Sequence, residues 1–274
     1  MEPFILQEEE YMVLADWVQK YPNLKAGFTS KNGGQSEKDF LSLNLGFHVG
    51  DQLENVRQNR KIVADKLTIP LEDWVGAEQT HEINIRKVTG RDRGKGAAEY
   101  NTAFKETDGF FTFEKNILLT LCFADCVPIF FFHPQSGAIG IAHAGWKGTV
   151  NGIAEEMVHT FQREGIKAKD ILVAIGPSIC ENCYIVDERV IKLVQNRLEG
   201  VDKKTYNLVN DHQFRLNLKE CNRQILLKAG VQYEHIGLTN YCTSCHQEYF
   251  YSHRRDKGKT GRLMGFIGWK EDNQ

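Results

Sequence analysis

The chain has 274 residues and a formal net charge of −2, with 36 acidic against 34 basic residues, so no overall basic field favours nucleic-acid binding. Its 41% hydrophobic content is ordinary for a globular protein. The acidic start lacks signal-peptide features, and Asp125 and Pro128 interrupt the most apolar stretch, ILLTLCFADCVPIFFFHP, which makes it a poor membrane span. We therefore expect a cytoplasmic protein, not associated with a membrane, whose seven cysteines stay reduced.

Strand-like and helix-like segments alternate along the chain, with no internal repeat and no low-complexity linker. We expect one domain over residues 1–274, of class α/β (or α+β) with mixed sheets. Neither a GxGxxG nor a GxxxxGK[ST] motif occurs, so the sequence supports neither a dinucleotide site nor a P-loop. In chain order, the patterns predict a strand at 25–30, a helix at 51–67, strands at 83–88, 108–113, 117–124, 127–133 and 137–143, a helix at 150–165, a strand at 170–177, helices at 187–198 and 216–230, and strands at 235–240 and 262–269.

The stretch CFADCVPIFFFHPQSGAIGIAHAGWKG predicts a β-hairpin closed at residues 134–137. If Gln135 and Ser136 are the two loop residues, Cys126 faces Gly145, and Cys126 and His143 share one face of the sheet as diagonal neighbours. A loop longer or shorter by one residue would place them on opposite faces.

The residues alone leave three roles open for Cys126 and His143: a nucleophile and its base, two ligands of one metal, or two unrelated side chains at strand ends. Asp125, an acid at a strand break, needs a partner or water and strengthens the case for a site. A catalytic zinc has three protein ligands, and His81 in EQTHEINI could be the third. Spacing cannot choose His81 over His48, His246 or His253.

Several cations are candidates for binding an anion. The Gly-rich segment HAGWKGT leads into the helix predicted at 150–165, with Thr149 as its N-cap, and residues 145–148 with Lys147 could cradle a phosphate. Arg60, Arg254, Arg255 and Arg262 are further candidates, because the planar guanidinium group suits phosphate. For each, an ordinary surface ion pair or a capped helix is the alternative.

Two CxxC pairs, Cys180 with Cys183 and Cys242 with Cys245, offer a rival metal site with four thiolates. Their separation is far longer than in a zinc ribbon, which disfavours that interpretation. Neither pair clearly opens a helix after a strand, so a thioredoxin-like redox role is weaker still.

The ordered motifs GFTSKNGGQS, SLNLGFHVGD, VRQNR, EQTH, TDGFFT, ADCVPIFFFHP, AHAGWKGTVNGI, IGPSICENCYIV, CTSC and FYSHRRDKGKTGR span nearly the whole chain. With them the sequence resembles the bacterial YfiH/YlmD-type family, once labelled multicopper polyphenol oxidase or laccase-like and now described as zinc-containing purine nucleoside phosphorylases. Two positions depart from the family pattern, Lys147 in place of Arg and His253 in place of Tyr. Cys180 is also a local variation, which weakens the four-thiolate interpretation.

The resemblance implies a single-domain sandwich of mixed β-sheets flanked by helices. It implies one Zn²⁺ per chain, held by His81, Cys126 and His143, and phosphorolysis of adenosine, inosine, guanosine and methylthioadenosine to base and ribose 1-phosphate, with adenosine deamination besides. Asp125 joins Cys126 and His143 as a candidate catalytic residue, orienting a ligand or moving a proton. The candidate contacts to nucleoside or phosphate are Arg60, Lys147, Asn44 and Arg254.

Copper is not expected, because multicopper oxidases use His-x-His pairs and this chain has nine histidines and no such pair. Two other functions remain as alternatives. One is a Cys–His hydrolase that edits a cell-wall precursor, with Cys126 as nucleophile and His143 as base. The other is a non-catalytic nucleotide-binding module with a structural metal.

Overall fold

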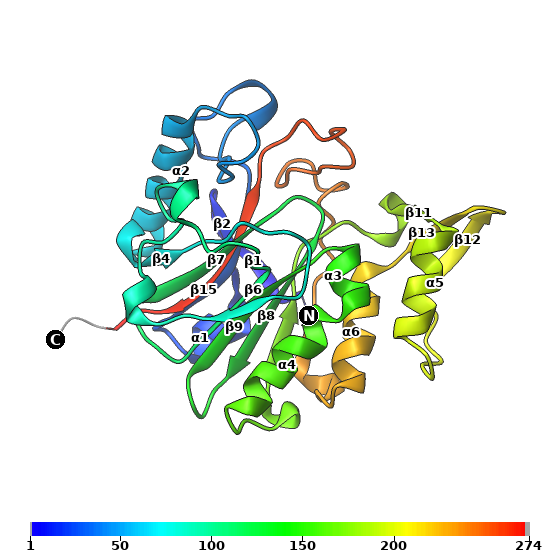
Figure 1. The fold of residues 1–274 in the computed structure, drawn as a ribbon. Helices are drawn as coiled ribbons and strands as arrows, with labels where there is room; N and C mark the ends of the chain where they lie inside the picture. Colours follow the sequence, from blue (N-terminus) through cyan, green and yellow to red (C-terminus); the bar gives the residue numbers. More distant parts are fainter. Residues whose placement is uncertain (1, 272–274) are drawn as a thin grey trace.

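A computed structural model describes residues 2–271, in which two six-stranded mixed sheets pack face to face with helices outside them (Figure 1). The first sheet has the order β1 (Phe4–Glu8), β2 (Tyr11–Leu14), β3 (Leu24–Thr29), β15 (Leu263–Trp269), β7 (Ile117–Phe123), β4 (Trp74–Val75). The second has the order β14 (Ile236–Leu238), β10 (Leu172–Ile175), β8 (Val127–His133), β9 (Ala138–Ala144), β6 (Gly109–Thr112), β5 (Ile85–Lys87). The predicted class, a sandwich of mixed sheets, is confirmed.

Helices cover both outer faces of the sandwich, and one short helix, Ala15–Lys20, packs Trp17 against the core between the sheets. The helices are α1 (Ala15–Lys20), α2 (Leu53–Leu67), α3 (Trp146–Asn151), α4 (Ile153–Arg163), α5 (Glu188–Arg197) and α6 (Leu218–Lys228). Helix α2 lies over the first sheet, and α3, α4 and α6 lie over the second (Figure 1). A small third sheet, in the order β11 (Ile185–Asp187), β13 (Gln213–Leu216), β12 (Tyr206–Asn210), projects from one side together with α5. No helix in the described part of the chain is long and apolar enough to cross a membrane.

Strand alternation explains why β8 is apolar from Val127 to Phe132. Val127, Ile129 and Phe131 point to the helix-covered core, whereas Phe130 and Phe132 point into the core between the sheets. A strand buried on both faces needs apolar residues at every position, and the register is then fixed by which side chain fits which layer. Strands β8 and β9 form the predicted hairpin and are the two central strands of the second sheet.

The helix predicted at 150–165 is wrong at its start. Helix α3 begins at Trp146 with Gly145 as N-cap, and Gly152, with φ of +92°, separates α3 from α4. Thr149 is therefore not an N-cap. It is buried within α3, where its hydroxyl accepts a hydrogen bond from Asn222 at 3.0 Å. The helix therefore begins at Trp146, three residues after His143, and not at residue 150 as Thr149 had indicated.

Candidate metal centre and binding cavity

The hairpin register brings Cys126 and His143 to one end of the second sheet. Val127 pairs with Ala144 and Pro128 with His143, the register that the predicted turn requires. His81 reaches the same point from the loop before β5. The ligand atoms of His81, Cys126 and His143 all lie within 4.8 Å of one another, and the two imidazole rings have centroids 4.8 Å apart.

Asp108 contacts two of these three residues, the ring of His143 and the backbone of His81, and was missed by the sequence reasoning. Its carboxylate, fully buried just before β6, lies 2.8 Å from His143 Nδ1 and accepts backbone N–H bonds from Thr80, His81 and Glu82, each at 3.0 Å. A carboxylate only accepts, so Nδ1 carries a proton toward Asp108, and Nε2 is the nitrogen of His143 that would bind a metal once it has lost its own proton. The available signal was an acid directly before a buried strand, in TDGFFT.

Gly145 leaves the room that the three side chains need. A Cβ at this position would lie 3.0 Å from Cys126 Sγ and 3.0 Å from His81 Cδ2, tighter than most Cβ contacts, so these side chains would have to shift by a few tenths of an ångström. His81 itself has a φ of +65°, a conformation uncommon for residues with a side chain, and the Asp108 carboxylate holds its backbone N–H there. The backbone is thus shaped around the cluster.

The charges of the cluster favour a thiolate. Burial alone would raise the pKa of Cys126, but the charge of His143 and hydrogen bonds from His143 and His81 outweigh burial and lower that pKa to about 6. Burial would lower the pKa of His143, but the Cys126 thiolate and Asp108 raise it to about 9. The pKa of Asp108 is lowered despite its burial, because His143 and the backbone N–H groups bind its charged form. A metal entering the site would therefore meet a sulfur that is ready to bind and would displace one proton from His143.

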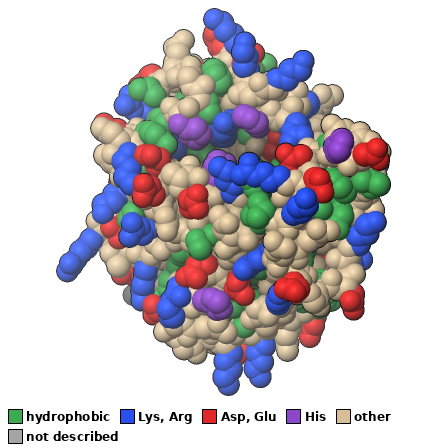
Figure 2. Space-filling model, turned by 45° about the vertical axis from the view of Figure 1, so that its right-hand side comes forward, with side chains coloured by type: hydrophobic (Ala, Val, Ile, Leu, Met, Phe, Trp, Pro, Cys, Tyr) green, Lys and Arg blue, Asp and Glu red, His purple; other side chains and the backbone are tan. Residues whose placement is uncertain are grey.

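The donor set fits a zinc ion of the catalytic type: two imidazoles, one thiolate, a carboxylate behind one imidazole, and an open side. The open side is a cavity of about 360 Å³, a volume within the range of small-molecule pockets. Figure 2 shows histidine side chains gathered around a hollow with Lys or Arg side chains beside it. Its lining consists of His48, Gln79, His81, Tyr100, Cys122, Ala124, Cys126, His143, His253 and Arg262.

The cavity is electropositive around Arg262. Burial, and then the charges of Arg262 and Arg60, lower the pKa of His48 to about 4, so His48 is neutral at pH 7. The Nη1 group of Arg262 donates to the carbonyls of Thr260 and Gly261 at 3.1 Å, which fixes the guanidinium plane at the cavity wall. Arg262 is thus the arginine that the fold places beside the candidate metal ligands.

Arg60 does not lie on the cavity surface, contrary to the expectation that it binds phosphate. It is 4% exposed, all three of its nitrogens donate to the protein, and its guanidinium lies 4.3 Å from the Phe47 ring centroid. The acceptors are the carbonyls of Leu45, Gly96 and Ala97 and the sulfur of Cys122. Its charge holds two loops together instead.

Asn44 is also fully buried within the chain rather than in the cavity wall. Its amide bonds Asp51 at 2.9 Å, and its oxygen accepts from the backbone of Gly46 and Arg262. It therefore fixes the segment that carries Arg262.

Lys147 and Arg254 are both exposed. Lys147 extends over the Trp146 ring, at 5.9 Å from the centroid, in the first turn of α3. Arg254 lies over the Tyr184 ring and donates to the Ile185 carbonyl at 2.9 Å. Neither side chain is part of the cavity lining, so a contact with substrate would need one of them to move.

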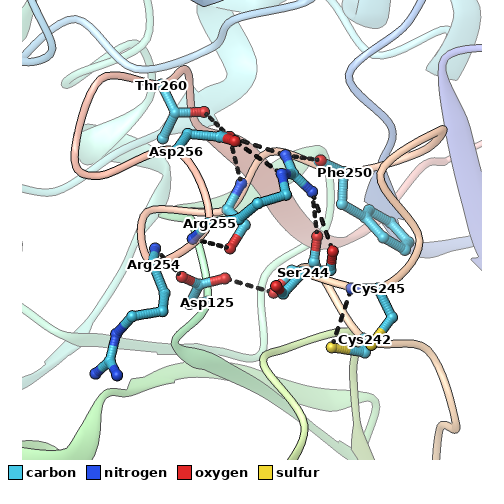
Figure 3. A network of polar contacts seen from close by, with 11 residues as sticks. Asp125, Cys242, Ser244, Cys245, Phe250, Arg254, Arg255, Asp256 and Thr260 are labelled. Carbon is cyan, nitrogen blue, oxygen red and sulfur yellow. Dashed lines mark hydrogen bonds and ion pairs between the residues drawn. The ribbon is translucent and has the colours of Figure 1, made fainter. Parts of the chain in front are cut away.

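Asp125 acquires partners that the sequence did not indicate. One carboxylate oxygen accepts from the Thr243 hydroxyl at 2.6 Å and the other from the Arg254 backbone N–H at 2.7 Å (Figure 3). These bonds stabilise its positive φ of +86°, a conformation costly for a residue with a side chain. Asp125 therefore joins the segment before Cys126 to the loops at 242–245 and 252–256.

Comparison with known proteins finds relatives that match nearly the whole chain. Residues 25–270 match the family described as multi-copper polyphenol oxidoreductase laccase. A curated relative from Bacillus subtilis, purine nucleoside phosphorylase YlmD, is 50% identical over 273 residues, covering 98% of either chain.

Solved structures match equally well. YlmD from Geobacillus stearothermophilus has a TM-score of 0.96 at 45% identity and covers 99% of this chain and 100% of its own. The hypothetical protein YfiH from Bacillus licheniformis has a TM-score of 0.95 at 49% identity and covers 98% of this chain and 100% of its own. Sequence and structure comparisons thus both match YlmD and YfiH proteins over nearly the whole of this chain.

Proposed function

This chain belongs to the family described as multi-copper polyphenol oxidoreductase laccase, and we propose that it is a zinc-containing purine nucleoside phosphorylase. The relatives' name supports the reaction class, and one geometric observation carries the proposal. Three ligand atoms of His81, Cys126 and His143 meet at a cavity, and a fully buried carboxylate orients one of them. A structural zinc is enclosed by four protein ligands, whereas this set has three and opens to a cavity.

Zinc bound there would act as a Lewis acid and would lower the pKa of a bound water. The chain's own residues supply the rest. His143 is held by Asp108, Gly145 keeps the approach to the cluster open, and Arg262 presents a cation to the cavity. We place the phosphate beside Arg262, with Lys147 and Arg254 as candidate contacts at the rim, because a guanidinium in a partly enclosed cavity binds a phosphate dianion strongly.

In the proposed reaction a phosphate oxygen forms a bond to C1′ of the ribose while the bond from C1′ to the purine nitrogen breaks. The purine leaves with the bonding electron pair and takes up a proton. Neutral His48 and the rings of Tyr100 and His253 line the cavity and are suited to stacking against a purine and bonding its edge. The expected substrates are adenosine, inosine, guanosine and methylthioadenosine, with adenosine deamination as a second activity.

The test is to incubate the purified protein with inosine and phosphate and to follow free hypoxanthine and ribose 1-phosphate. Wild-type protein should form both in equal amounts, and His143→Ala should not. A His133→Ala variant is a matched control, because His133 lies at the far end of β8 in the exposed turn. No product with wild-type protein, or equal rates with His143→Ala, would reject the proposal.

The same geometry favours one alternative, a Cys–His hydrolase. Cys126, His143 and Asp108 have the arrangement of nucleophile, base and orienting acid, and the lowered pKa of Cys126 suits a nucleophile. Zinc binding separates the two functions. A hydrolase would lack bound zinc and lose a thiol-dependent activity on alkylation of Cys126, whereas the phosphorylase should hold zinc that His81→Ala removes.

We further propose that the protein acts in the cytoplasm. The chain's seven cysteines are all unpaired thiols, which is typical of a reducing compartment.

A further inference from the structure

A second cluster of sulfur ligands lies outside the cavity just described. Strands β10 and β14 are parallel neighbours, so the loops at their carboxyl ends leave the sheet at the same edge. A further parallel bridge between Ser178 and Cys242 extends the pairing past both strands. The first loop carries Cys180 and Cys183 and the second carries Cys242 and Cys245, and the four Sγ atoms all lie within 4.8 Å of one another.

We propose that these four cysteines bind a second zinc ion, as a closed structural site with four thiolate ligands. Zinc holds thiolate sulfur at about 2.3 Å in a tetrahedron, which places the sulfur atoms about 3.8 Å apart. Cys245 Sγ lies 3.9 Å from Cys180 Sγ and 3.4 Å from Cys183 Sγ, so the sulfurs are already close to that spacing. All four are unpaired thiols, with no disulfide among them.

Two backbone N–H groups point at one sulfur of the cluster. Cys242 Sγ accepts hydrogen bonds from the backbone N–H of Cys180 at 3.2 Å and of Cys245 at 3.4 Å. The second bond folds the CTSC loop around its own first sulfur, so that both cysteines of this pair face the same point. N–H bonds to sulfur stabilise the charged form, as they do for carboxylates.

A buried cation compensates the charge that such a site would carry. Four thiolates around one zinc ion bear a net charge of −2, which needs a counter-charge in a partly buried place. Lys219, 6% exposed in the first turn of α6, donates from Nζ to the carbonyls of Thr239 and Tyr241, both at 2.9 Å, in the segment that leads to Cys242. Burial lowers the pKa of Lys219, and the thiolates of Cys242 and Cys180 act against that effect and favour its charged form.

The position of this site indicates a role in holding the cavity together. Thr243, inside the CTSC loop, bonds Asp125, and the Arg255 guanidinium donates to the carbonyls of Thr243 and Ser244 at 3.0 and 3.4 Å (Figure 3). Asp125 directly precedes Cys126. A zinc ion here would fix the loop that supports Asp125, and through it the backbone at the first metal centre. Since all four positions are protein ligands, none is left for substrate.

The four-cysteine site is tested in a variant that lacks the ligands of the first metal centre. The result therefore does not depend on the proposed phosphorolysis. His81→Ala/Cys126→Ala protein, purified without chelator, should still contain one zinc per chain by elemental analysis. Adding Cys245→Ser should abolish that zinc, and adding Cys221→Ala, which removes a buried thiol elsewhere in α6, should not. Cobalt loaded in place of zinc should give the intense visible and near-ultraviolet bands of tetrahedral thiolate coordination, lost only with Cys245→Ser.

A second measurement covers the case in which the double variant does not fold. In wild-type protein, a mercurial reagent that titrates thiols should release two zinc ions per chain, one with Cys126 and one in proportion to the four clustered thiols, and Cys245→Ser protein should release one zinc fewer. Iron instead of zinc at the four sulfurs would overturn the metal identity. Four freely reactive thiols with no metal, or a disulfide among them, would overturn the site itself.

Discussion

Replacing Asp108 with Asn tests whether one buried carboxylate controls the candidate zinc centre. The carboxylate now accepts from His143 and from three consecutive backbone N–H groups of the loop that carries His81. Asn offers a single oxygen acceptor and replaces the other oxygen with a donor. If the remaining oxygen keeps the bonds from His143 and His81, the N–H groups of Thr80 and Glu82 lose their acceptor.

The expected cost follows from these contacts. A fully buried N–H that loses its partner costs about 1–3 kcal/mol, and these two bonds are only partly buried, so the free energy of unfolding should fall by about 1–3 kcal/mol in all. Loss of the carboxylate behind a ligating histidine typically weakens metal binding 10- to 100-fold, about 1.4–2.7 kcal/mol. The Asn side chain also permits the wrong tautomer of His143, with its proton on the nitrogen that should bind zinc.

The assay is a competition titration of zinc against a chromophoric chelator at pH 7, with thermal unfolding of the metal-free protein measured in parallel. Asp92→Asn is the matched control, because Asp92 also accepts an N–H and a hydroxyl bond, both from Thr89, far from the cluster. Asp92→Asn should leave the zinc affinity unchanged. If Asp108→Asn lowers the unfolding temperature but binds zinc as tightly as wild type, Asp108 supports only the fold and the reasoning is refuted.

Four further outcomes are expected. Gly145→Ala should weaken zinc binding at least tenfold in the same titration, because the new Cβ would press on Cys126 and His81, and unchanged affinity would show that the cluster can shift. In zinc-stripped protein, alkylation of Cys126 should be half-maximal near pH 6, since its lowered pKa keeps the thiolate present above that pH; a midpoint near 9 would contradict the ion pair. Arg60→Met should lower the free energy of unfolding by about 3 kcal/mol or more in urea denaturation, because several buried carbonyls lose their donors, and a change below about 1 kcal/mol would speak against this role. Arg262→Lys should raise the KM for phosphate more than the KM for inosine, and an equal rise in both would place the phosphate elsewhere.

Local patterns predicted the parts of the fold that local physics decides. The turn at 134–137 fixes the hairpin length, and alternation then determines the register, so Cys126 and His143 could be placed together without any knowledge of the other sheet. The start of α3 could not be predicted in the same way, because glycine and threonine are comparable N-cap residues and the local sequence does not choose between Gly145 and Thr149. Tertiary contacts, with Asn222 bonding Thr149 inside the helix, decided that case.

The charged residues were harder to place, because a motif shows that a side chain matters without showing which way it points. Arg60 and Arg262 both looked suited to an anion, yet one is enclosed by carbonyls and the other lines the cavity. His81 could not be distinguished from His48 by spacing, because its selection depends on Asp108, more than twenty residues further along the chain. Contacts between distant loops carry no periodic signal in a single sequence.

Long sequence separation proved a poor argument against the four-cysteine cluster. Zinc ribbons have short spacing because each pair lies on one hairpin, whereas here two parallel strands of a large sheet deliver the pairs, and a parallel connection requires a long crossover. The intervening chain from 184 to 241 builds the small third sheet, α5 and α6, and returns to pair beside β10. The separation therefore reflects the topology between the pairs and says nothing about the distance between the sulfurs. The same topology places Thr243 against Asp125, so whatever holds the CTSC loop also holds the strand break before Cys126.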